Sequence, residues 1–353
     1  MKNKLWLKII LGTVSVILLI AVSFVGYLTV TEYRPEDIQD AEWQYVTDGK
    51  TAEAGGQMTL YSWNIGYAGL GASTDFFMDG GKNVDPTASE VDENLTAIKN
   101  FISSHPADAW LLQEVDTNSA RTGYVNELEA ISEVYGGSYG LAYNYKCDFV
   151  PIPIPPIGKV ESGIATFTDG IVNVNGSFRR IALPCPFSWP VSVANLKRCL
   201  LVTRLNVEGS EREVVLVNLH LEAYDDGQGK IAQTKQLMEL LEKEYEAGNY
   251  VIAGGDFNQV FPGTLDTYPV ADGVWTPGIL EEESLPDGFS YAFDGDSATC
   301  RLLDRPLDDG SQKYVLDGFI VSPNVRVDLV DTVELGFANS DHEPVMLQVT
   351  LTP

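Results

Sequence analysis

The first thirty residues contain a long apolar run. Residues 9–30 include no charged side chain, and this stretch of 22 residues is long enough to cross a hydrocarbon core of about 30 Å as a helix. Lys2, Lys4 and Lys8 precede the run, and basic residues before a membrane span stay in the cytoplasm. The pattern predicts a cytoplasmic basic segment at 1–8 and a single-pass transmembrane signal-anchor at 9–30. The remaining chain would then lie outside the cell membrane.

A cleaved signal peptide is the alternative interpretation of this run. Residues 21–23, Ala-Val-Ser, have the small side chains of a cleavage site. However, Phe24, Val25, Tyr27 and Leu28 continue the apolar pattern beyond them. This continuation favours an uncleaved anchor. No cysteine lies near the span, so a lipid-modified cysteine anchor is not supported.

Beyond the span, the pattern changes twice. Residues 31–56 are polar and end in Ala-Gly-Gly, which predicts a juxtamembrane linker. From residue 57 to 353, short strand-like runs alternate with a few stretches of helical spacing. Strands are predicted at 58–63, 109–112, 214–221, 250–253, 314–321 and 345–351, and helices at 88–103, 125–134 and 231–245. Many strands and few helices predict one domain at 57–353, with two packed sheets and helices outside them.

Two loops of this domain are rich in proline and apolar side chains. Residues 149–157 are wholly apolar, and residues 182–190 repeat that character. The proline content favours extended backbone over helix. Either these loops pack on the core, as apolar residues usually do, or they form an apolar lip that touches lipid or an apolar substrate.

Composition narrows the choice of partners. Residues 31–353 hold 20 basic and 50 acidic side chains, a balance of −30. Tight binding to nucleic acid usually needs a basic surplus, which this domain lacks, although acidity also serves simply to keep an exported protein soluble. Four cysteines lie in this part with irregular spacing and no zinc pattern, so disulfides and free thiols both stay open: Cys147, Cys185, Cys199 and Cys300.

Polar side chains follow several of the predicted strands. Asn64 closes the first strand, Glu114 follows the second, Asp256 and Asn258 follow a later one, and Asp341 precedes the last. Carboxylate and amide oxygens gathered at one end of a sheet suit a hard divalent cation such as Mg²⁺ or Mn²⁺.

Two of the three histidines lie within these same motifs. His220 shares a strand face with Asn218, and His342 directly follows Asp341. Asp317 lies inside an apolar strand, where an unpaired charge is costly. A pair between Asp317 and His342 would satisfy that charge and hold the imidazole in one tautomer.

Each motif alone has a structural explanation, because Gly-Asp-x-Asn also forms ordinary turns and a lone strand histidine is usually structural. Together and in order, they resemble the endonuclease/exonuclease/phosphatase superfamily of DNase I-like, metal-dependent phosphoesterases. The resemblance covers about residues 57–353 and identifies the chain as a membrane-anchored member of bacterial type. The motifs are Ser-Trp-Asn-Ile (62–65), Leu-Gln-Glu-Val-Asp (112–116), Asn-Leu-His-Leu (218–221), Gly-Gly-Asp-Phe-Asn (254–258), Leu-Asp-Gly-Phe-Ile-Val-Ser (316–322) and Ser-Asp-His-Glu-Pro (340–344).

The resemblance implies a four-layer α/β/β/α sandwich of two mixed sheets, with the site at one edge of the sheets. It implies that Asn64 and Glu114 hold the divalent ion, with Asp341 as a nearby or second-site metal ligand. Asp256, helped by Asn258, would deprotonate the attacking water. The remaining roles concern the phosphate: His342, steadied by Asp317, would act on it as acid or base, and His220 would stabilise its developing charge.

Two positions depart from the family pattern. Some members carry an acid two residues after the first Asn, where this chain has Gly66. The metal shell would be thinner there. Many members also have a tyrosine that contacts phosphate, and Tyr143 and Tyr145 are the candidates here.

These observations favour an outward-facing, membrane-anchored hydrolase that depends on Mg²⁺ or Mn²⁺ and cleaves a phosphodiester or phosphomonoester bond with activated water. The expected partners are a phosphoester substrate, either a lipid head group or a small molecule, and the membrane through the N-terminal helix. The sequence predicts no protein partner. An exported or surface endonuclease acting on DNA or RNA is the main alternative. A binding module that kept the fold without catalysis is the second.

Overall fold

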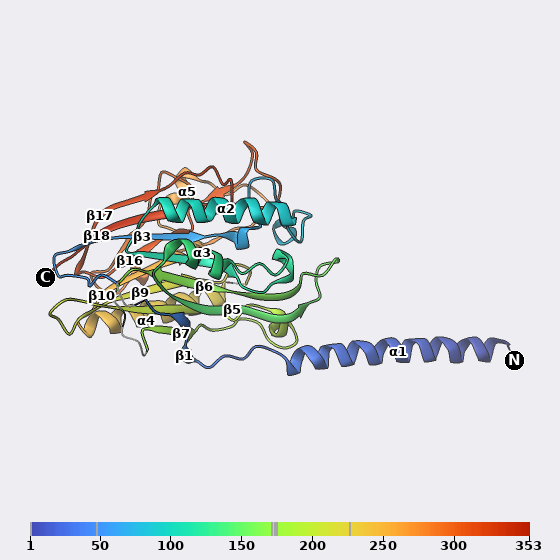
Figure 1. Cartoon of the computed structure of the whole chain (residues 1–353). Coiled ribbons are helices and arrows are strands. Elements are labelled where there is room, and N and C mark those ends of the chain that lie inside the picture. The colour runs from blue at the N-terminus through green and yellow to red at the C-terminus, as the bar shows by residue number, and fades with distance from the viewer. Residues whose placement is uncertain (1, 47–48, 171, 173–175, 226) are drawn as a thin grey trace.

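The computed structural model describes residues 2–46, 49–170, 172, 176–225 and 227–353. A long helix, α1 (Lys2–Val30), projects from a body built around two seven-stranded sheets (Figure 1). The first sheet has the order β1 (Ile38–Asp40), β7 (Phe178–Ala182), β8 (Cys199–Asn206), β9 (Glu213–His220), β10 (Tyr250–Asp256), β16 (Asp317–Val321), β13 (Ser290–Ala292). The second has the order β17 (Val325–Thr332), β18 (Val345–Leu351), β3 (Gln57–Asn64), β4 (Ala109–Asp116), β6 (Gly158–Thr168), β5 (Ser138–Val150), β2 (Glu42–Gln44).

Helices cover the outer faces of both sheets. α2 (Ala88–Ser104) and α3 (Glu127–Tyr135) pack on the second sheet, and α4 (Gln228–Glu246) packs on the first. A short helix, α5 (Thr264–Thr267), and the small ladders β11 (Gln259–Val260) with β12 (Gly278–Ile279) and β14 (Cys300–Arg301) with β15 (Lys313–Tyr314) lie in the connections. The layers therefore run α/β/β/α, which confirms the expected fold.

Hydrophobic side chains fill the space between the two sheets and beneath the helices. Leu60 and Leu111 of the second sheet meet Leu216 and Ile252 of the first in one buried cluster. These strands carry apolar side chains on both faces because a helix covers one face and the other sheet covers the opposite face. The near-continuous apolar runs that predicted the strands are thus explained by burial on both sides.

The start of α2 shows how local sequence sets an element boundary. Thr87 accepts a hydrogen bond from the Glu90 amide, and the Glu90 carboxylate in turn accepts from the Thr87 amide. This capping box satisfies backbone donors that a helix start leaves free. The helix predicted at 88–103 accordingly begins at Ala88 and ends at Ser104.

The segment 31–56, predicted as a linker, instead contributes to both sheets. β1 pairs with β7 at the edge of the first sheet, and β2 pairs with β5 at the edge of the second. Ala41, between the two strands, is buried and donates its amide to the Phe178 carbonyl at 3.0 Å. The prediction missed these strands because three-residue edge strands are held by backbone pairing and show no hydrophobic periodicity.

Most of the cysteines lie inside the body, whereas the N-terminal helix extends away from it. All four cysteines are free thiols, with Cys147, Cys199 and Cys300 buried and Cys185 exposed. Residues 4–30 form a helix long and apolar enough to cross a membrane, and its most apolar part is not buried against the body. A signal sequence near the N-terminus has the same length and composition.

Gly255 provides a test of how closely the first sheet is packed. Its φ is +151°, and a Cβ placed there would lie 2.0 Å from the Leu219 carbonyl oxygen. Gly255→Ala should lower the free energy of unfolding by about 2–4 kcal/mol, since backbone strain and overpacking add. Urea unfolding of the full chain in detergent micelles, followed by tryptophan fluorescence, measures the loss.

Gly248→Ala is the matched control for that substitution. Gly248 also has a positive φ, +93°, but a Cβ there would meet nothing within 4 Å. Only backbone strain remains, so the expected loss is about 1 kcal/mol. Equal losses in the two variants would contradict the close approach at Gly255.

Candidate active site

Three strands of the first sheet carry the polar side chains into one row. β10 pairs in parallel with β9 and antiparallel with β16, so that Asp256 lies opposite His220 on one side and Asp317 on the other. Residues in register on neighbouring strands point to the same face of a sheet. The end of β10 therefore brings His220, Asp256 and Asp317 side by side.

The second sheet supplies two further groups, Asn64 at the end of β3 and Glu114 on β4. The register between β4 and β6 shifts between Leu112 and Val115, and Glu114 has a φ of +56°. This bulge re-aims a side chain that strict alternation would not place there. The sequence predicted that this strand stops at Leu112, whereas it continues through the bulge to Asp116.

Asn64 joins the two sheets at this end. Its Nδ2 donates to Asp256 Oδ2 at 3.1 Å and to Glu114 Oε1 at 3.2 Å. Behind it, Gln113 Nε2 donates to Asn218 Oδ1 at 2.8 Å, and Asn218 Nδ2 donates to the Leu112 and Ala165 carbonyls. These buried amides hold the ends of the two sheets at a set spacing.

The loop before β18 adds the last groups. Ser340 Oγ donates to the Asn64 carbonyl at 2.7 Å, and Trp63 Nε1 donates to the His342 carbonyl at 2.9 Å. With its backbone anchored in this way, His342 places Nδ1 2.8 Å from Asp317 Oδ2 and Nε2 3.7 Å from Asp256 Oδ2. The pairing of Asp317 with His342 that the sequence suggested is present.

The two histidines of the site have opposite electrostatic surroundings. Burial lowers the pKa of His220 well below its usual range, and the charges of Arg198 and His342 lower it further. Burial also lowers the pKa of His342, but the negative charges around it, led by Asp317, outweigh burial and raise it well above the usual range. His220 is therefore neutral and His342 cationic at neutral pH.

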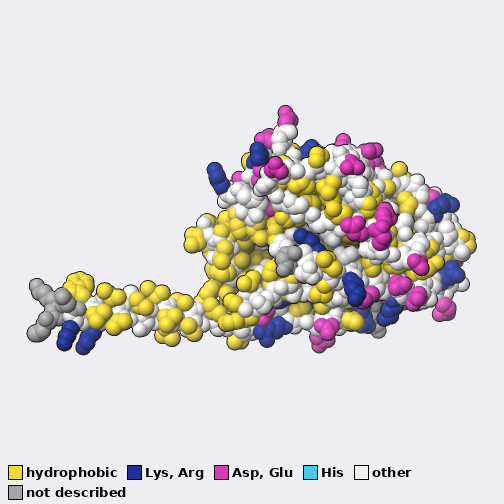
Figure 2. All heavy atoms as spheres, turned by 180° about the vertical axis from the view of Figure 1, so that it is seen from behind, with side chains coloured by type: hydrophobic (Ala, Val, Ile, Leu, Met, Phe, Trp, Pro, Cys, Tyr) yellow, Lys and Arg dark blue, Asp and Glu magenta, His cyan; other side chains and the backbone are white. Residues whose placement is uncertain are grey.

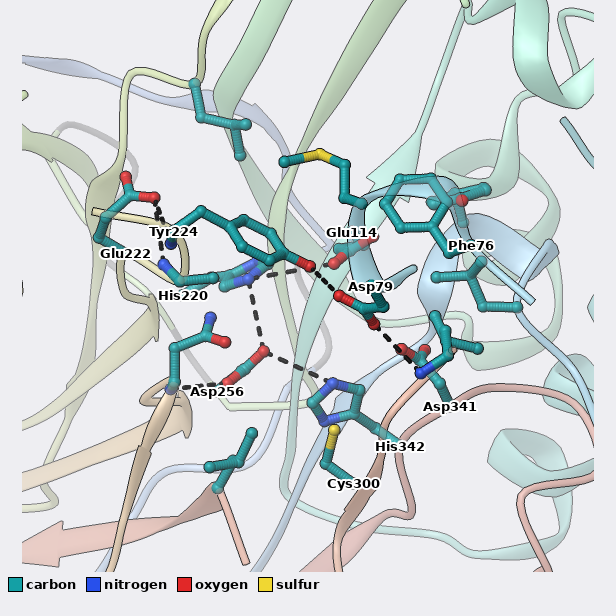
Figure 3. Close-up of a pocket in the computed structure, with 18 of the residues that line it drawn as sticks. Phe76, Asp79, Glu114, His220, Glu222, Tyr224, Asp256, Cys300, Asp341 and His342 are labelled. Carbon is teal, nitrogen blue, oxygen red and sulfur yellow. Dashed lines mark hydrogen bonds and ion pairs between the residues drawn. The ribbon is translucent and has the colours of Figure 1, made fainter. Parts of the chain in front are cut away.

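Carboxylates crowd the same space (Figure 3). Burial raises the pKa of Asp256 to about 6, and the charge of Asp317 acts in the same direction. Burial raises the pKa of Asp341 to about 7, and the Glu114 charge adds to the rise. Burial is the largest cause of both shifts and the neighbouring carboxylates add to them, so a divalent cation bound here would favour the ionised carboxylates.

Two sets of oxygen and nitrogen atoms qualify as ligands for a cation. Atoms of Asp256, Asp317 and His342 all lie within 4.8 Å of one another. The 2.8 Å hydrogen bond between Asp317 and His342 already uses the facing atoms of that pair. The hydrogen bonds that Glu114 accepts from Asn64 at 3.2 Å and Asp341 accepts from Ser340 at 3.4 Å are longer, and the Glu114 side chain is a quarter exposed to the pocket. The donor set of Asn64, Glu114 and Asp341 therefore fits a hard cation better.

A pocket of about 310 Å³ opens over these groups. The sequence missed several polar residues that line it, and Asp79 and Tyr224 are the clearest examples. Tyr224 donates its hydroxyl to Asp79 Oδ1 at 2.7 Å, and Figure 3 shows this pair between His220 on one side and Asp341 on the other. Tyr224 lies only four residues after His220 of the predicted motif, whereas Asp79 ends a short 3-10 helix (Phe77–Asp79) that no sequence pattern marks.

Three arginines with largely buried side chains also line the pocket: Arg121, Arg198 and Arg301. Arg198 lies 3.7 Å from Glu222, and both side chains are almost fully buried. Arg121 makes a bidentate pair with Asp116 at 2.9 and 2.7 Å, and its guanidinium lies 3.6 Å from the centre of the Tyr67 ring. Arg121 and Arg198 are therefore each paired with an acid, and the pocket lining still holds more acidic side chains than arginines.

The two candidate tyrosines and Gly66 have different surroundings in the structure. Tyr145 lines the pocket, whereas the Tyr143 hydroxyl shares a hydrogen bond with Thr117 Oγ1 at 3.1 Å. At Gly66, φ is +52° and a Cβ would lie 3.0 Å from Asp341 Oδ1. The side chains of Asp341, Leu70 and Ser340 therefore occupy the space that an acidic side chain at position 66 would need.

Comparison with known proteins agrees with this geometry. The Endonuclease/Exonuclease/phosphatase family matches residues 61–342. No curated protein matches the chain in sequence.

Solved structures share the fold at low sequence identity. An endonuclease/exonuclease/phosphatase from Beutenbergia cavernae DSM 12333 is 16% identical with a TM-score of 0.57, and the match covers 84% of this chain and 72% of that chain. A protein of the same description from Bacteroides vulgatus is 15% identical with a TM-score of 0.52, covering 84% and 99%. Because the family match spans most of the sequence, the protein belongs to the endonuclease/exonuclease/phosphatase family.

Proposed function

We propose that this protein is a divalent-metal-dependent phosphoesterase that hydrolyses a phosphodiester or phosphomonoester P–O bond with an activated water. The observation that carries the proposal is the row of His220, Asp256 and Asp317, closed by His342 at 2.8 Å from Asp317. The row combines a buried base, a cationic imidazole and a neutral imidazole around one point of the pocket. Hydrolysis of a phosphate ester needs this combination, because water must lose a proton while charge develops on the phosphoryl oxygens.

Asp256 takes the proton of the attacking water. The Asn258 amide donates to Asp256 Oδ1 at 2.8 Å, which fixes the carboxylate and leaves Oδ2 facing the pocket groups. A pKa of about 6 suits a general base that works near neutral pH. The side-chain amide of Asn258 donates to the Leu221 carbonyl at 2.9 Å and is not free to contact the water. Asn258 therefore helps only by positioning Asp256 through its backbone N–H.

His342 acts on the ester from the side of the leaving group. Asp317 engages Nδ1, so the Nε2 proton faces the pocket and is available to the departing alkoxide. His220 stays neutral and adds a donor for the phosphoryl oxygens. The water oxygen becomes bonded to phosphorus, the P–O bond to the leaving group breaks, and the water proton ends on Asp256. No further co-reactant is needed.

Asn64, Glu114 and Asp341 would hold Mg²⁺ or Mn²⁺. A bound divalent ion supplies charge stabilisation at the phosphoryl oxygens. Ligation by Asn64 requires its amide to turn over, because the amide now directs Nδ2 toward Glu114 and Asp256. The surplus of negative charge at Asp341 supports this assignment.

The helix α1 supports a membrane-anchored protein with the catalytic body outside the cell, since the lysines precede the apolar run. The substrate class follows from this placement and from charge. A balance of −30 in residues 31–353 opposes the approach of DNA or RNA, so a lipid head group or a small phosphoester is favoured over nucleic acid. An exported endonuclease is the second candidate, supported by the family and by the arginines in the pocket.

Substitution of the two principal groups tests the reaction. Asp256→Asn and His342→Gln should each lower kcat for bis(4-nitrophenyl) phosphate by about 10³-fold, because each removes a proton-transfer group. The assay uses the full chain in detergent with Mg²⁺ or Mn²⁺, and plasmid DNA and RNA are tested in parallel. Faster cleavage of nucleic acid than of any small or lipid phosphoester would favour the endonuclease.

Matched controls lie elsewhere in the chain. His105, the third histidine, stacks on Phe101 with ring centroids 4.0 Å apart, far from the catalytic row, and Asp266 is exposed on α5. His105→Gln and Asp266→Asn should keep the activity of the unchanged protein. Full activity in Asp256→Asn or His342→Gln would refute the mechanism, and absence of turnover in the unchanged protein would favour a binding module.

The metal assignment has its own test. Glu114→Gln should weaken Mn²⁺ binding at least ~10-fold, measured by isothermal titration calorimetry on the full chain, because a charged oxygen ligand is lost. Glu242→Gln, at an exposed position of α4, should bind Mn²⁺ as the unchanged protein does. Removal of the ion by EDTA should abolish turnover, and added Mn²⁺ should restore it. Equal affinity in the two variants would move the metal site away from Glu114.

A further inference from the structure

Three apolar segments meet at the end of the body nearest α1. They are the tip of the β5–β6 hairpin at 149–157, the loop between β7 and β8 at 184–191, and the turn at 76–78, and together they are called the collar here. None of them contains a charged residue. The sequence left open whether the two proline-rich loops pack on the core. They do so only in part: Val150 and Ile157 are buried, whereas Ile154 is 94% exposed and Ile152 is 68% exposed.

The exposed side chains of the collar form one surface. Trp189, Val191 and Met78 are also largely exposed. Figure 2 shows hydrophobic side chains gathered on the end of the body that adjoins α1, beside a hollow in the surface. Soluble proteins rarely expose such large apolar side chains together to water, so this surface is expected to bind another apolar surface.

The collar is attached to the last two turns of α1. The Phe24 and Phe149 rings meet edge to face with centroids 5.8 Å apart. Trp189 Nε1 donates to Thr29 Oγ1 at 3.1 Å, and Tyr27 donates to Asp148 at 2.9 Å. The collar therefore lies beside the helix, and its depth in a membrane follows from the depth of these residues.

The helix geometry places the collar below the membrane surface. An apolar run of 22 residues is about 33 Å long as a helix, slightly more than a hydrocarbon core of about 30 Å. Phe24 precedes Val30 by six residues, which is about 9 Å along the axis. With 9–30 spanning the bilayer, Phe24 and Phe149 lie within its outer half. The hairpin tip that continues from Phe149 is then in contact with lipid.

The collar is also continuous with the pocket. Phe76, Met78, Ile157 and Phe187 line the mouth of the pocket that holds Asp256 and the other catalytic groups. A molecule that enters from the membrane side thus passes apolar side chains first and charged groups afterwards. An amphiphile with a phosphoester head and a hydrocarbon tail matches that order.

We propose that the collar is a membrane-docking surface that seats the pocket on the outer leaflet of the bilayer crossed by α1. Resting on the proposed phosphoesterase function, the substrate is a phospholipid of that same leaflet, whose head group enters the pocket while its tails stay at the collar. The loops themselves carry no charged side chain, and the adjacent Asp148 accepts a hydrogen bond from Tyr27 of α1. Because α1 and the collar are in contact, the collar can dock only on the bilayer that α1 crosses.

The depth of the collar is tested by fluorescence. Cys185 is exposed within the collar and the other three cysteines are buried, so an environment-sensitive thiol dye on the full chain labels the collar. After reconstitution into phosphatidylcholine vesicles containing acyl-chain nitroxide lipid, the dye should be quenched at least threefold more strongly than at a control position. The control variant combines Cys185→Ser with Ser210→Cys. Ser210 is exposed in the turn between β8 and β9, at the end of β8 that lies away from the collar.

Equal quenching at the two positions would overturn the docking surface. A collar buried instead by a second copy of the chain would protect the dye from nitroxide lipid and appear as a dimer by crosslinking. That outcome would overturn the proposal as well. This measurement needs no catalysis, so its result stands whether or not the phosphoesterase function is correct.

The substrate class is tested by turnover. Ile152→Ser, Ile154→Ser and Trp189→Ser combined should lower hydrolysis of lipid in vesicles of phosphatidylcholine, phosphatidylethanolamine and phosphatidylglycerol at least tenfold, followed by release of phosphorylated head group or phosphate. Turnover of soluble bis(4-nitrophenyl) phosphate should be unchanged, because none of these residues lines the pocket. The matched control combines Ile231→Ser, Ile279→Ser and Leu329→Ser, which are exposed apolar residues elsewhere.

The outcomes separate the two proposals. No turnover of the soluble diester by the unchanged protein would refute the phosphoesterase function. Turnover of the soluble diester without any lipid hydrolysis, or equal loss in the collar and control variants, would refute the lipid substrate alone.

Discussion

The contact between the two sheets at Asn64 is the constraint on which the site depends. One amide nitrogen lies 3.1 Å from Asp256 of the first sheet and 3.2 Å from Glu114 of the second. The amide network of Gln113 and Asn218 behind it sets the same spacing from within the core. Because buried amides must be satisfied, a slide of one sheet over the other would cost several hydrogen bonds together. The hydrophobic cluster between the sheets drives their association, and these polar contacts determine the register.

That fixed spacing produces the electrostatic division of the site. Asp317 raises the pKa of His342 by its charge, while burial and the positive charges of Arg198 and His342 lower the pKa of His220, although Asp256 Oδ2 lies 3.4 Å from its Nε2. Two chemically identical side chains a few ångströms apart thereby carry different charges at neutral pH. The difference comes from their positions, since His220 belongs to β9 and His342 to the loop before β18, where it bridges to Cys300 of β14 and contacts Asp317 of β16. The strand register thus leaves His342 protonated and able to donate a proton, and His220 neutral and able to donate only a hydrogen bond.

Sequence patterns predicted those parts of the fold whose burial is strongest. The strand predicted at 214–221 is observed at Glu213–His220 and the helix predicted at 88–103 at Ala88–Ser104, because both faces or one stripe of these elements are apolar. The edge strand Ile38–Asp40 carries no such signal, since its stability comes from pairing with β7. Local composition therefore identifies elements that bury side chains and misses those held by backbone alone.

The candidate site shows the same division. Groups within motifs, such as Asp256 and His342, were identifiable because their chemistry requires a fixed residue type next to a strand end. Asp79 was not, because its place in the pocket depends on a hydrogen bond to Tyr224, which is 145 residues away in the chain. The bulge that turns Glu114 toward Asn64 was equally hidden, since a register shift arises from pairing between strands.

The acidity of the body gives the collar its physical significance. An excess of 30 negative charges in residues 31–353 repels the anionic lipids of a membrane surface, so electrostatic attraction cannot hold the pocket there. As the proposed anchor, the helix α1 would keep the body within a few nanometres of the bilayer, and the local concentration that it imposes would make even a weak apolar contact sufficient. The collar then needs only to orient the pocket, which a handful of exposed side chains such as Ile152, Ile154 and Trp189 can do. In this proposal the anchor α1 holds the body near the bilayer, and the collar orients the pocket toward it.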